Sequence, residues 1–338
     1  MYEKLGKDRC YIIAEIGGNF LHYEEAVALI DAAAYSGVDC VKMQTFKADT
    51  ISTRSAYFDM ESTGKISQYD YFKKYEISEE LHRKVFAYAT EKGLDWFSTP
   101  SHPEDADMLE RLGIRAFKLG ADDATNIPLL RYIAKKKLPI LISSGMCTMQ
   151  EVREAVDVIL GEGNDKIVIF HTVSAYPCYS EYVNLNVILS LQKEFPDLFI
   201  GYSDHTLTTA AAIAAASMGA AVVERHFTLD KYAEGPDHKI SSTPEEMKYI
   251  VDTIREIEIM RGTGLKRPVG PEVLNRINNR KSITAIKDIK QGTMITCENI
   301  DVKRPGTGIS PQYMEQIIGK RATRNIAIDE LVLWSDIE

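Results

Sequence analysis

The chain has 338 residues, a length that allows two domains or one large α/β barrel with an appendage. Apolar residues make up 45% and charged residues 26%, a globular balance that excludes a disordered chain, a collagen-like fibre and a coiled coil. Forty basic and forty-nine acidic side chains give a net charge of -9 without a basic arm, so nucleic acid is not an expected partner.

The cysteines and the N-terminus indicate where the protein resides. Five scattered cysteines form no C-x-x-C pair, which predicts neither a disulfide framework nor a thiolate zinc site. The N-terminus is charged from its third residue and lacks the apolar stretch of a signal peptide. The uncharged run 206–223 is mostly Ala, Thr, Ser and Gly, so it predicts a buried helix and a strand rather than a membrane span. We therefore expect a cytoplasmic protein with no membrane partner.

Short apolar runs alternate with helical patterns along most of the chain. Eight candidate strands are residues 11–17, 38–44, 96–100, 116–120, 139–145, 167–173, 198–204 and 221–227. Helical periodicity covers residues 24–36, 79–92, 104–112 and 149–160, and a last helix is expected to run to about Met260. Eight such units in roughly 260 residues predict a (β/α)8 TIM barrel. The insertion at residues 46–75 is a candidate lid.

The pattern changes after Gly262, where Gly264, Pro268, Gly270 and Pro271 interrupt any helix. Residues 282–338 then read as short β segments around turns. The sequence therefore predicts a catalytic barrel at residues 1–265, a linker at 266–281 and a small β-rich domain at 282–338. Such a short domain has a thin core by itself, so we expect it to lean on a barrel, either its own or that of a partner subunit.

Polar residues occur at the carboxyl end of each predicted strand, where a barrel places its active site. Because side chains alternate along a strand, Lys42 and Gln44 share a face, as do the pairs Ser203 with His205 and Glu224 with His226. One such residue can serve packing alone, but a whole ring of them favours function. Burying Lys42 and Lys118 in apolar strands is unfavourable without an anion. Two lysines on different strands therefore predict a phosphate or carboxylate ligand.

His205 and His226 end two neighbouring predicted strands, which lie ~4.8 Å apart in a sheet. Two imidazoles placed in this way can share one metal ion. Two nitrogens with oxygen ligands suit Mn²⁺, Fe²⁺, Co²⁺ or Zn²⁺, and spacing alone does not choose among these ions.

The strand ends also form a recognisable series of motifs. They are AEIG at 14–17, KMQT at 42–45, FSTP at 97–100, FKLG at 117–120, ISSGM at 142–146, GYSDHT at 201–206 and ERHFT at 224–228. In this order they closely resemble the sialic acid (nonulosonic acid) synthase family. The motif VKRPGTG at 302–308 is similar to the C-terminal antifreeze-like (SAF) domain of those enzymes. The resemblance extends over nearly the whole chain.

The resemblance implies a reaction and a role for each matching residue. Phosphoenolpyruvate would condense with N-acetylmannosamine or a related 2-acetamido sugar, giving a nine-carbon 2-keto acid and phosphate. By analogy with the family, the residues that bind phosphoenolpyruvate are Lys42, Thr99, Lys118, Ser143 and Ser203. Those at the sugar are Gln44, Tyr176, Asp237 and Arg304, and those with catalytic roles are Asp123, Glu15 and Lys118.

The same resemblance implies a divalent metal on His205 and His226. Mn²⁺ is the expected ion, with Mg²⁺ or Co²⁺ as alternatives. Arg304 would reach into the partner subunit, which implies a domain-swapped homodimer.

Several positions depart from the common family pattern. Residues 120–123 read Gly-Ala-Asp-Asp where many members have Gly-Ser-Gly-Glu, so the proton-transferring carboxylate becomes the shorter Asp123 and Ala121 lacks a hydroxyl. Ser174 replaces a frequent Asn, and Phe20 replaces a His. These changes leave the sugar open among N-acetylmannosamine, its 6-phosphate and a 2,4-diacetamido-6-deoxy sugar.

Three other readings of these residues stay open. A metal-dependent aldolase that uses pyruvate would also suit His205, His226 and Lys118. A Schiff-base aldolase would use Lys42 or Lys118 as its nucleophile. A binding protein on the same scaffold would explain the departures at Phe20 and Ala121.

Overall fold

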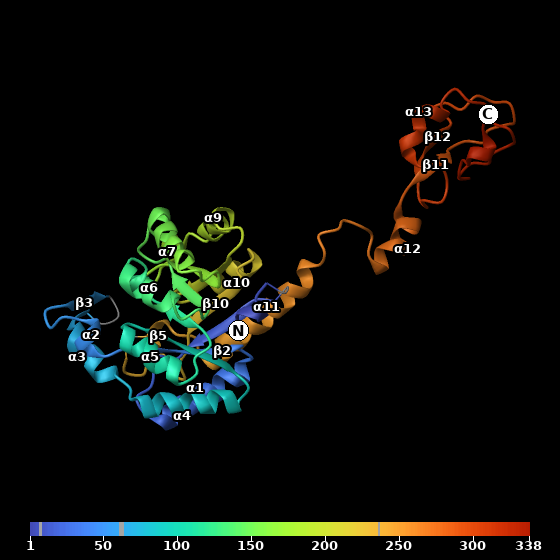
Figure 1. Cartoon of the computed structure of the whole chain (residues 1–338). Helices are drawn as coiled ribbons and strands as arrows, with labels where there is room; N and C mark the ends of the chain where they lie inside the picture. The colour runs from blue at the N-terminus through green and yellow to red at the C-terminus, as the bar shows by residue number, and fades with distance from the viewer. Residues whose placement is uncertain (7–8, 61–63, 236) are drawn as a thin grey trace. The chain divides into compact units, whose positions relative to one another are not determined.

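The computed structural model describes residues 1–6, 9–60, 64–235 and 237–338 (Figure 1). The chain divides into two compact units, Met1–Gly262 and Thr263–Glu338. Each unit is described by itself below.

The first unit is a closed barrel of eight parallel strands in the order β1-β10-β9-β8-β7-β6-β5-β2. The strands are β1 (Tyr11–Glu15), β2 (Cys40–Thr45), β5 (Asp95–Pro100), β6 (Phe117–Leu119), β7 (Ile140–Ser143), β8 (Ile167–Thr172), β9 (Phe199–Asp204) and β10 (Val222–His226). Each lies within or overlaps one of the eight runs expected from the sequence. The predicted TIM barrel is therefore confirmed.

Helices surround the strands (Figure 1). They are α1 (Tyr23–Ser36), α4 (Glu79–Glu91), α5 (Pro103–Arg111), α6 (Ile127–Ala134), α7 (Met149–Gly161), α8 (Ser180–Val183), α9 (Asn186–Glu194), α10 (Ala210–Ser217) and α11 (Pro244–Arg261). Capping boxes at Thr148 and Thr243 start α7 and α11. With helices outside, a strand such as β8 is buried along its whole length. No helix among the described residues is long and apolar enough to span a membrane.

The long insertion after β2 has a structure of its own. It contains α2 (Ala48–Ile51), the antiparallel hairpin of β3 (Tyr57–Met60) and β4 (Gly64–Ser67), and α3 (Gln68–Tyr75). The sequence indicated a loop here and did not predict these elements. Phe46, Phe58, Tyr71 and Phe72 pack edge to face, with neighbouring ring centroids 5.0 to 5.7 Å apart. We call these four residues the aromatic roof.

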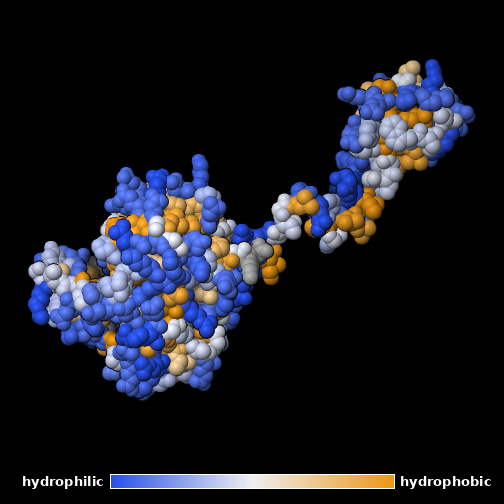
Figure 2. All heavy atoms as spheres, viewed as in Figure 1, coloured by the Kyte–Doolittle hydropathy of each residue, from blue (hydrophilic) through white to orange (hydrophobic). Residues whose placement is uncertain are grey.

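The second unit begins with α12 (Gly270–Asn279), which lies inside the segment expected to be a linker. It continues with the antiparallel pair β11 (Ser282–Ala285) and β12 (Ile300–Lys303) and with α13 (Met314–Ile317). Its core is small and built largely of isoleucine. Val273, Leu274 and Ile277 of α12 are exposed, and apolar surface gathers along this segment (Figure 2).

A fully buried arginine joins the ends of β9 and β10. Arg225 Nη1 lies 2.6 Å from Asp204 Oδ2, and the two side chains are 1% and 0% exposed. Arg225 Nη2 donates to the Thr206 carbonyl oxygen at 2.8 Å, and Nε donates to Ser242 Oγ at 2.5 Å. His205 and His226 directly follow these two paired residues in the sequence. The arginine therefore fixes the backbone from which both histidines project.

Replacing Arg225 by Met should leave the Asp204 carboxylate buried without its counter-charge. We expect Arg225→Met to lower the free energy of unfolding by about 3–5 kcal/mol, measured by urea denaturation. Arg153→Met is the matched control, because it removes the exposed ion pair with Glu194 and should leave the urea midpoint unchanged. Equal midpoints for the two variants would contradict this role of Arg225.

Candidate active site

A cavity of about 450 Å³ opens at the carboxyl ends of the barrel strands. It is lined by all the site residues predicted from the sequence except Glu15, Asp123 and Arg304. The predicted residues that line it are Lys42, Gln44, Thr99, Lys118, Ser143, Tyr176, Ser203, His205, His226 and Asp237. The barrel therefore brings together side chains that are far apart in the sequence.

The strand register explains how these residues meet. Pairing of β1 with β2 sets Glu15 beside Lys42, and pairing of β10 with β9 sets Glu224 beside Ser203. In the same way, β2 and β5 place Gln44 beside Thr99. Because neighbouring parallel strands hold these residues at one level, their polar groups form a ring in the mouth of the barrel.

Four buried charged residues lie at the centre of this ring, and we call them the lysine cluster: Glu15, Lys42, Lys118 and Glu224. Lys42 Nζ is 2.5 Å from Glu15 Oε2, and Lys118 Nζ is 3.8 Å from Glu224 Oε1. Lys118 Nζ also donates to Ser143 Oγ at 2.5 Å, and Ser203 Oγ donates to Glu224 Oε1 at 3.1 Å. Each ammonium group thus has a carboxylate close to it.

The pKa values of the two buried lysines shift in opposite directions, because the carboxylate beside Lys42 lies closer to its ammonium group than the one beside Lys118. Burial lowers the pKa of Lys118 to about 8, and the more distant Glu224 only partly opposes this. Burial also acts against the charge on Lys42, but Glu15 and Glu224 outweigh it and raise the pKa of Lys42. Lys42 therefore keeps its proton at neutral pH, whereas Lys118 titrates close to that range.

The cavity also contains buried polar atoms that have no hydrogen-bond partner within the described parts of the chain. They include Thr99 Oγ1, Thr172 Oγ1 and Glu224 Oε2. Buried polar atoms in proteins are nearly always hydrogen-bonded, and exceptions are frequent where a ligand binds. The two threonine hydroxyls line a cavity that also contains two ammonium groups, which suits an anion, whereas Glu224 Oε2 can accept a hydrogen bond from a ligand.

The two predicted metal-binding histidines lie next to each other in the cavity, with ring centroids 5.4 Å apart. His205 Nδ1 lies 2.8 Å from the Val173 carbonyl oxygen. Because a carbonyl oxygen can only accept a hydrogen bond, Nδ1 of His205 must carry the proton. Nε2 of His205 is therefore free to bind a metal. Burial, and then the neighbouring His226, lower the pKa of His205 to about 4. His205 is therefore neutral at physiological pH, as a metal ligand must be.

Asp237 and Tyr176 lie against these imidazoles. Asp237 Oδ2 is 3.3 Å from His226 Nδ1, and the Tyr176 ring lies 4.2 Å from the His205 ring, centroid to centroid. Within the described ranges, no three His, Cys, Asp or Glu side chains converge on one point. The two imidazoles are therefore the candidate protein ligands, and a metal bound to them would take its other ligands from water or substrate oxygens.

The three predicted residues outside the cavity have different positions. Glu15 lies behind Lys42, to which it is ion-paired. Asp123 is buried and accepts a hydrogen bond from Asn126 Nδ2 at 2.9 Å. Burial and the adjacent Asp122 raise the pKa of Asp123 to about 6. Arg304 belongs to the second unit, so its contact with the sugar stays a prediction.

Several residues that line the cavity were absent from the predicted site. Glu224 shares a strand face with His226, so the alternation of side chains was a usable signal for it. Asp122 lines the cavity in place of Asp123, because both lie on the 3-10 turn Ala121–Asp123, where successive side chains point about 120° apart. The aromatic roof follows no periodic pattern, and the sequence offered no signal for it.

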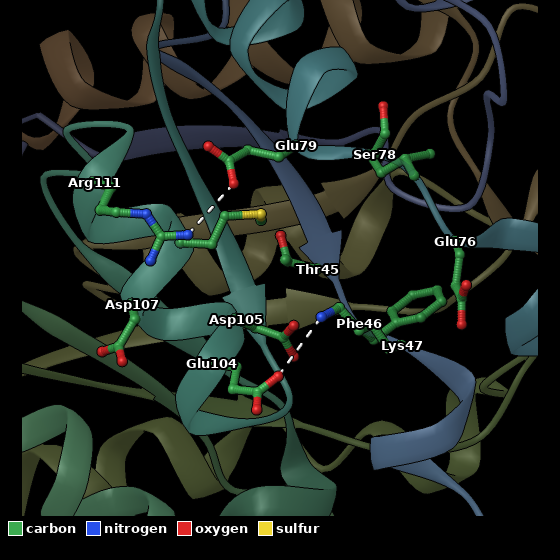
Figure 3. Close-up of a pocket in the computed structure, with 12 residues that line it drawn as sticks. Thr45, Phe46, Lys47, Glu76, Ser78, Glu79, Glu104, Asp105, Asp107 and Arg111 are labelled. Atoms are coloured by element: carbon green, nitrogen blue, oxygen red, sulfur yellow. Dashed lines mark hydrogen bonds and ion pairs between the residues drawn. The ribbon is translucent and has the colours of Figure 1, made fainter.

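A second cavity, of about 660 Å³, is lined by residues of α5, by residues 76–79 at the start of α4, and by residues 45–47 (Figure 3). Its cationic side chains pair with carboxylates at its edge, Lys47 with Glu104 at 3.6 Å and Arg111 with Glu79 at 3.4 Å. All four of these side chains are exposed. A cavity with paired, solvated charges lacks the buried cations of the barrel mouth, so it is not the candidate site.

Comparisons with known proteins agree with this geometry. Residues 29–266 match the NeuB family, and residues 280–338 match the SAF domain. The chain belongs to the NeuB family. The resemblance drawn from the strand-end motifs is thereby confirmed, together with the SAF domain. As a member of the NeuB family the protein is an enzyme of the synthase type.

Individual relatives of this NeuB protein extend over nearly its whole length. It is 40% identical to the N,N'-diacetyllegionaminic acid synthase of Legionella pneumophila, over 97% of this chain and 95% of that one. It is 33% identical to the human N-acetylneuraminate-9-phosphate synthase, over 97% and 92%. The crystal structure of the spore coat polysaccharide biosynthesis protein SpsE of Bacillus subtilis superposes with a TM-score of 0.69 at 34% identity, over 99% and 97%. The relatives thus include synthases of different nonulosonic acids.

The pKa of Lys118 predicts how anion binding in this NeuB protein depends on pH. An anion beside Lys118 should lose affinity when the ammonium group loses its proton, above about pH 8. We expect the dissociation constant of phosphoenolpyruvate, measured by calorimetry, to rise about tenfold per pH unit above that value. Lys118→Arg keeps its charge, so its dissociation constant should not change with pH. A wild-type dissociation constant that is flat between neutral and alkaline pH would contradict this assignment.

Proposed function

We propose that the protein condenses phosphoenolpyruvate with a 2-acetamido sugar of the N-acetylmannosamine type, giving a nine-carbon 2-keto acid and phosphate. The observation that carries this proposal is one cavity lined by two unlike sets of groups. Two buried lysines, with threonine hydroxyls that have no hydrogen-bond partner among the described residues, support an anion site, and two imidazoles beside Asp237 support a metal site. Relatives named as synthases of legionaminic acid and of N-acetylneuraminate phosphate support the same reaction class.

Phosphoenolpyruvate would bind at the lysine cluster. Its phosphate and carboxylate give Lys42 and Lys118 a second source of negative charge, with Thr99, Ser143 and Ser203 as hydroxyl partners. Because Glu15 holds the ammonium group of Lys42 and Ser143 holds that of Lys118 in the protein alone, little rearrangement is needed when the anion binds. Glu15 acts through Lys42 in this scheme, since its carboxylate lies against that ammonium group.

The sugar would lie next to phosphoenolpyruvate, where Gln44, Tyr176 and Asp237 line the same cavity. We expect Arg304 of a partner subunit to contact it as well, in a domain-swapped homodimer. His205 and His226 would hold a divalent ion, with Mn²⁺ expected and Mg²⁺ or Co²⁺ as alternatives. When bound, such an ion polarises an aldehyde oxygen as a Lewis acid. The ring of Tyr176 against His205, and the carbonyl of Val173, hold that imidazole in one orientation.

The bonds change in two stages. Carbon three of phosphoenolpyruvate forms a bond with the aldehyde carbon of the sugar, and water then adds at carbon two. Phosphate leaves with cleavage of the C–O bond. Lys118, which lines the cavity, is proposed to move a proton, and its pKa of about 8 suits this role. Asp123 has a pKa of about 6 and lies next to the cavity-lining Asp122, so its proposed part in proton transfer requires access from the turn at residues 121–123.

The free cysteines support a cytoplasmic location. All five cysteines are free thiols, which is expected of a protein in the reducing cytoplasm. The exposed apolar side chains of α12 are suited to packing against another surface, as a swapped dimer requires.

The reaction is tested by incubating chelator-treated protein with phosphoenolpyruvate, Mn²⁺ and N-acetylmannosamine-type sugars. We expect phosphate release that requires both sugar and metal, with a product whose mass equals sugar plus pyruvic acid. A pyruvate aldolase would form product from pyruvate without releasing phosphate. Product formation from pyruvate in place of phosphoenolpyruvate would therefore overturn the proposal in favour of an aldolase.

His205→Ala tests the metal separately from the anion site. We expect this variant to lose metal-dependent turnover, because only one imidazole is left for the ion, while phosphoenolpyruvate binding measured by calorimetry is retained. His22→Asn is a suitable control, because His22 lies outside the cavity at the start of α1, where Asn is also a good N-cap. Wild-type turnover by His205→Ala would contradict the proposed metal site.

A further inference from the structure

The candidate cavity has two walls of opposite character. Its strand-end wall carries the lysine cluster and the two histidines. The facing wall comes from the insertion and is mainly apolar, because it consists of the aromatic roof and Ile51 together with one polar residue, Gln68. The Gln68 amide already accepts a hydrogen bond from Ser52 Oγ and donates one to the Tyr57 carbonyl oxygen. Substrate bound between the two walls must therefore be polar on one side and apolar on the other.

The aromatic roof is a packed unit rather than a set of separate rings. Phe58 meets Tyr71 at 5.4 Å and Phe72 at 5.7 Å, and Phe46 meets Phe72 at 5.0 Å, all edge to face. These rings come from β3, from α3 and from the loop after β2, so the fold of the insertion holds them together. A wall built in this way is largely preformed and offers apolar surface to a ligand.

The positive charge of the cavity is confined to the strand-end wall. Among its described lining residues, the only Lys or Arg side chains are Lys42 and Lys118, and both lie in the lysine cluster. The acidic side chains that line the cavity are Glu224, Asp122 and Asp237. A phosphate against the insertion side of the cavity would therefore meet the aromatic roof and would find no Lys or Arg counter-charge among the described residues of the insertion that line the cavity.

The cationic residues of the insertion are directed elsewhere. Arg54 lies over the Tyr69 ring at 4.2 Å, and Lys65 lies over the Tyr57 ring at 4.2 Å. Neither of them lines the cavity. The insertion thus contributes apolar surface to the site and no positive charge.

We infer that the sugar substrate is uncharged and carries an apolar group at its far end. This describes a 6-deoxy hexose with acylated amino groups, such as a 2,4-diacetamido-6-deoxy sugar, in preference to N-acetylmannosamine or its 6-phosphate. The inference rests on the proposed function and names its sugar. The methyl at carbon six and the acetyl methyl groups would lie against the aromatic roof, while Asp122 offers an acceptor for an amide N–H.

The test compares kcat/KM for these three sugars with phosphoenolpyruvate and Mn²⁺. We expect kcat/KM for the 2,4-diacetamido-6-deoxy sugar to exceed kcat/KM for N-acetylmannosamine by about tenfold or more, which is the usual size of discrimination by an apolar pocket. The 6-phosphate should be the poorest substrate. Phe58→Ala should bring the kcat/KM ratio of the 2,4-diacetamido-6-deoxy sugar to N-acetylmannosamine close to one. Tyr57→Ala is the matched control, because Tyr57 lies on the same strand, is 52% exposed and does not line the cavity.

A gain of activity provides the complementary test. Ile51→Lys places a cation on the apolar wall and should raise kcat/KM for the 6-phosphate about tenfold over the wild type, as expected for one new charge pair away from bulk water. Direct titration of each sugar into the protein with phosphoenolpyruvate present gives the same comparison from binding alone.

The outcomes separate the inference from the proposed function. If kcat/KM for N-acetylmannosamine or its 6-phosphate equals or exceeds kcat/KM for the deoxy sugar, the inference is overturned. Phosphate release would still support the synthase reaction in that case. An unchanged ratio in an active Phe58→Ala variant would also overturn it. Absence of phosphate release with all three sugars would count against the proposed function. In that case the direct titrations test the inference, which requires the deoxy sugar to bind most tightly and the 6-phosphate most weakly.

Discussion

The lysine cluster is the feature on which the rest of the site depends. Two ammonium groups inside a ring of apolar strands would be strongly unfavourable alone, and the carboxylates of Glu15 and Glu224 supply the charge that makes them tolerable. Because Glu15 holds Lys42 closely while Glu224 stays further from Lys118, the cluster retains the capacity to attract an anion. The site is therefore assembled in the protein alone, before any substrate binds.

Everything around the cluster serves to hold it at the mouth of the barrel. The strand register sets Glu15 beside Lys42 and Glu224 beside Ser203, and the buried Arg225 joins the two strands that carry the histidines. Above these polar groups the insertion adds an apolar wall. The proposed catalytic residues thus lie at the strand ends, whereas the residues proposed to select the sugar lie on the insertion. A loop of this kind can vary in sequence without disturbing the strand ends.

The sequence predicted the barrel because each strand is a short apolar run whose polar end residues occur at alternate positions. The same alternation placed Lys42, Ser203 and both histidines in the mouth. Asp123 came from the family resemblance instead, and its role stays a prediction. The alternation gave no sign of the aromatic roof, whose contacts join distant parts of the insertion. The role of Arg304 depends on how two units meet, which local sequence does not encode.

Calorimetry of metal-free protein with phosphoenolpyruvate measures directly whether the lysine cluster binds this anion. We expect saturable binding to the wild type, and about tenfold or greater loss of affinity in Lys42→Met, as expected when one of two buried counter-charges is removed. Failure of the wild type to bind, or equal affinity of the wild type and Lys42→Met, would show that the lysine cluster is not the anion site.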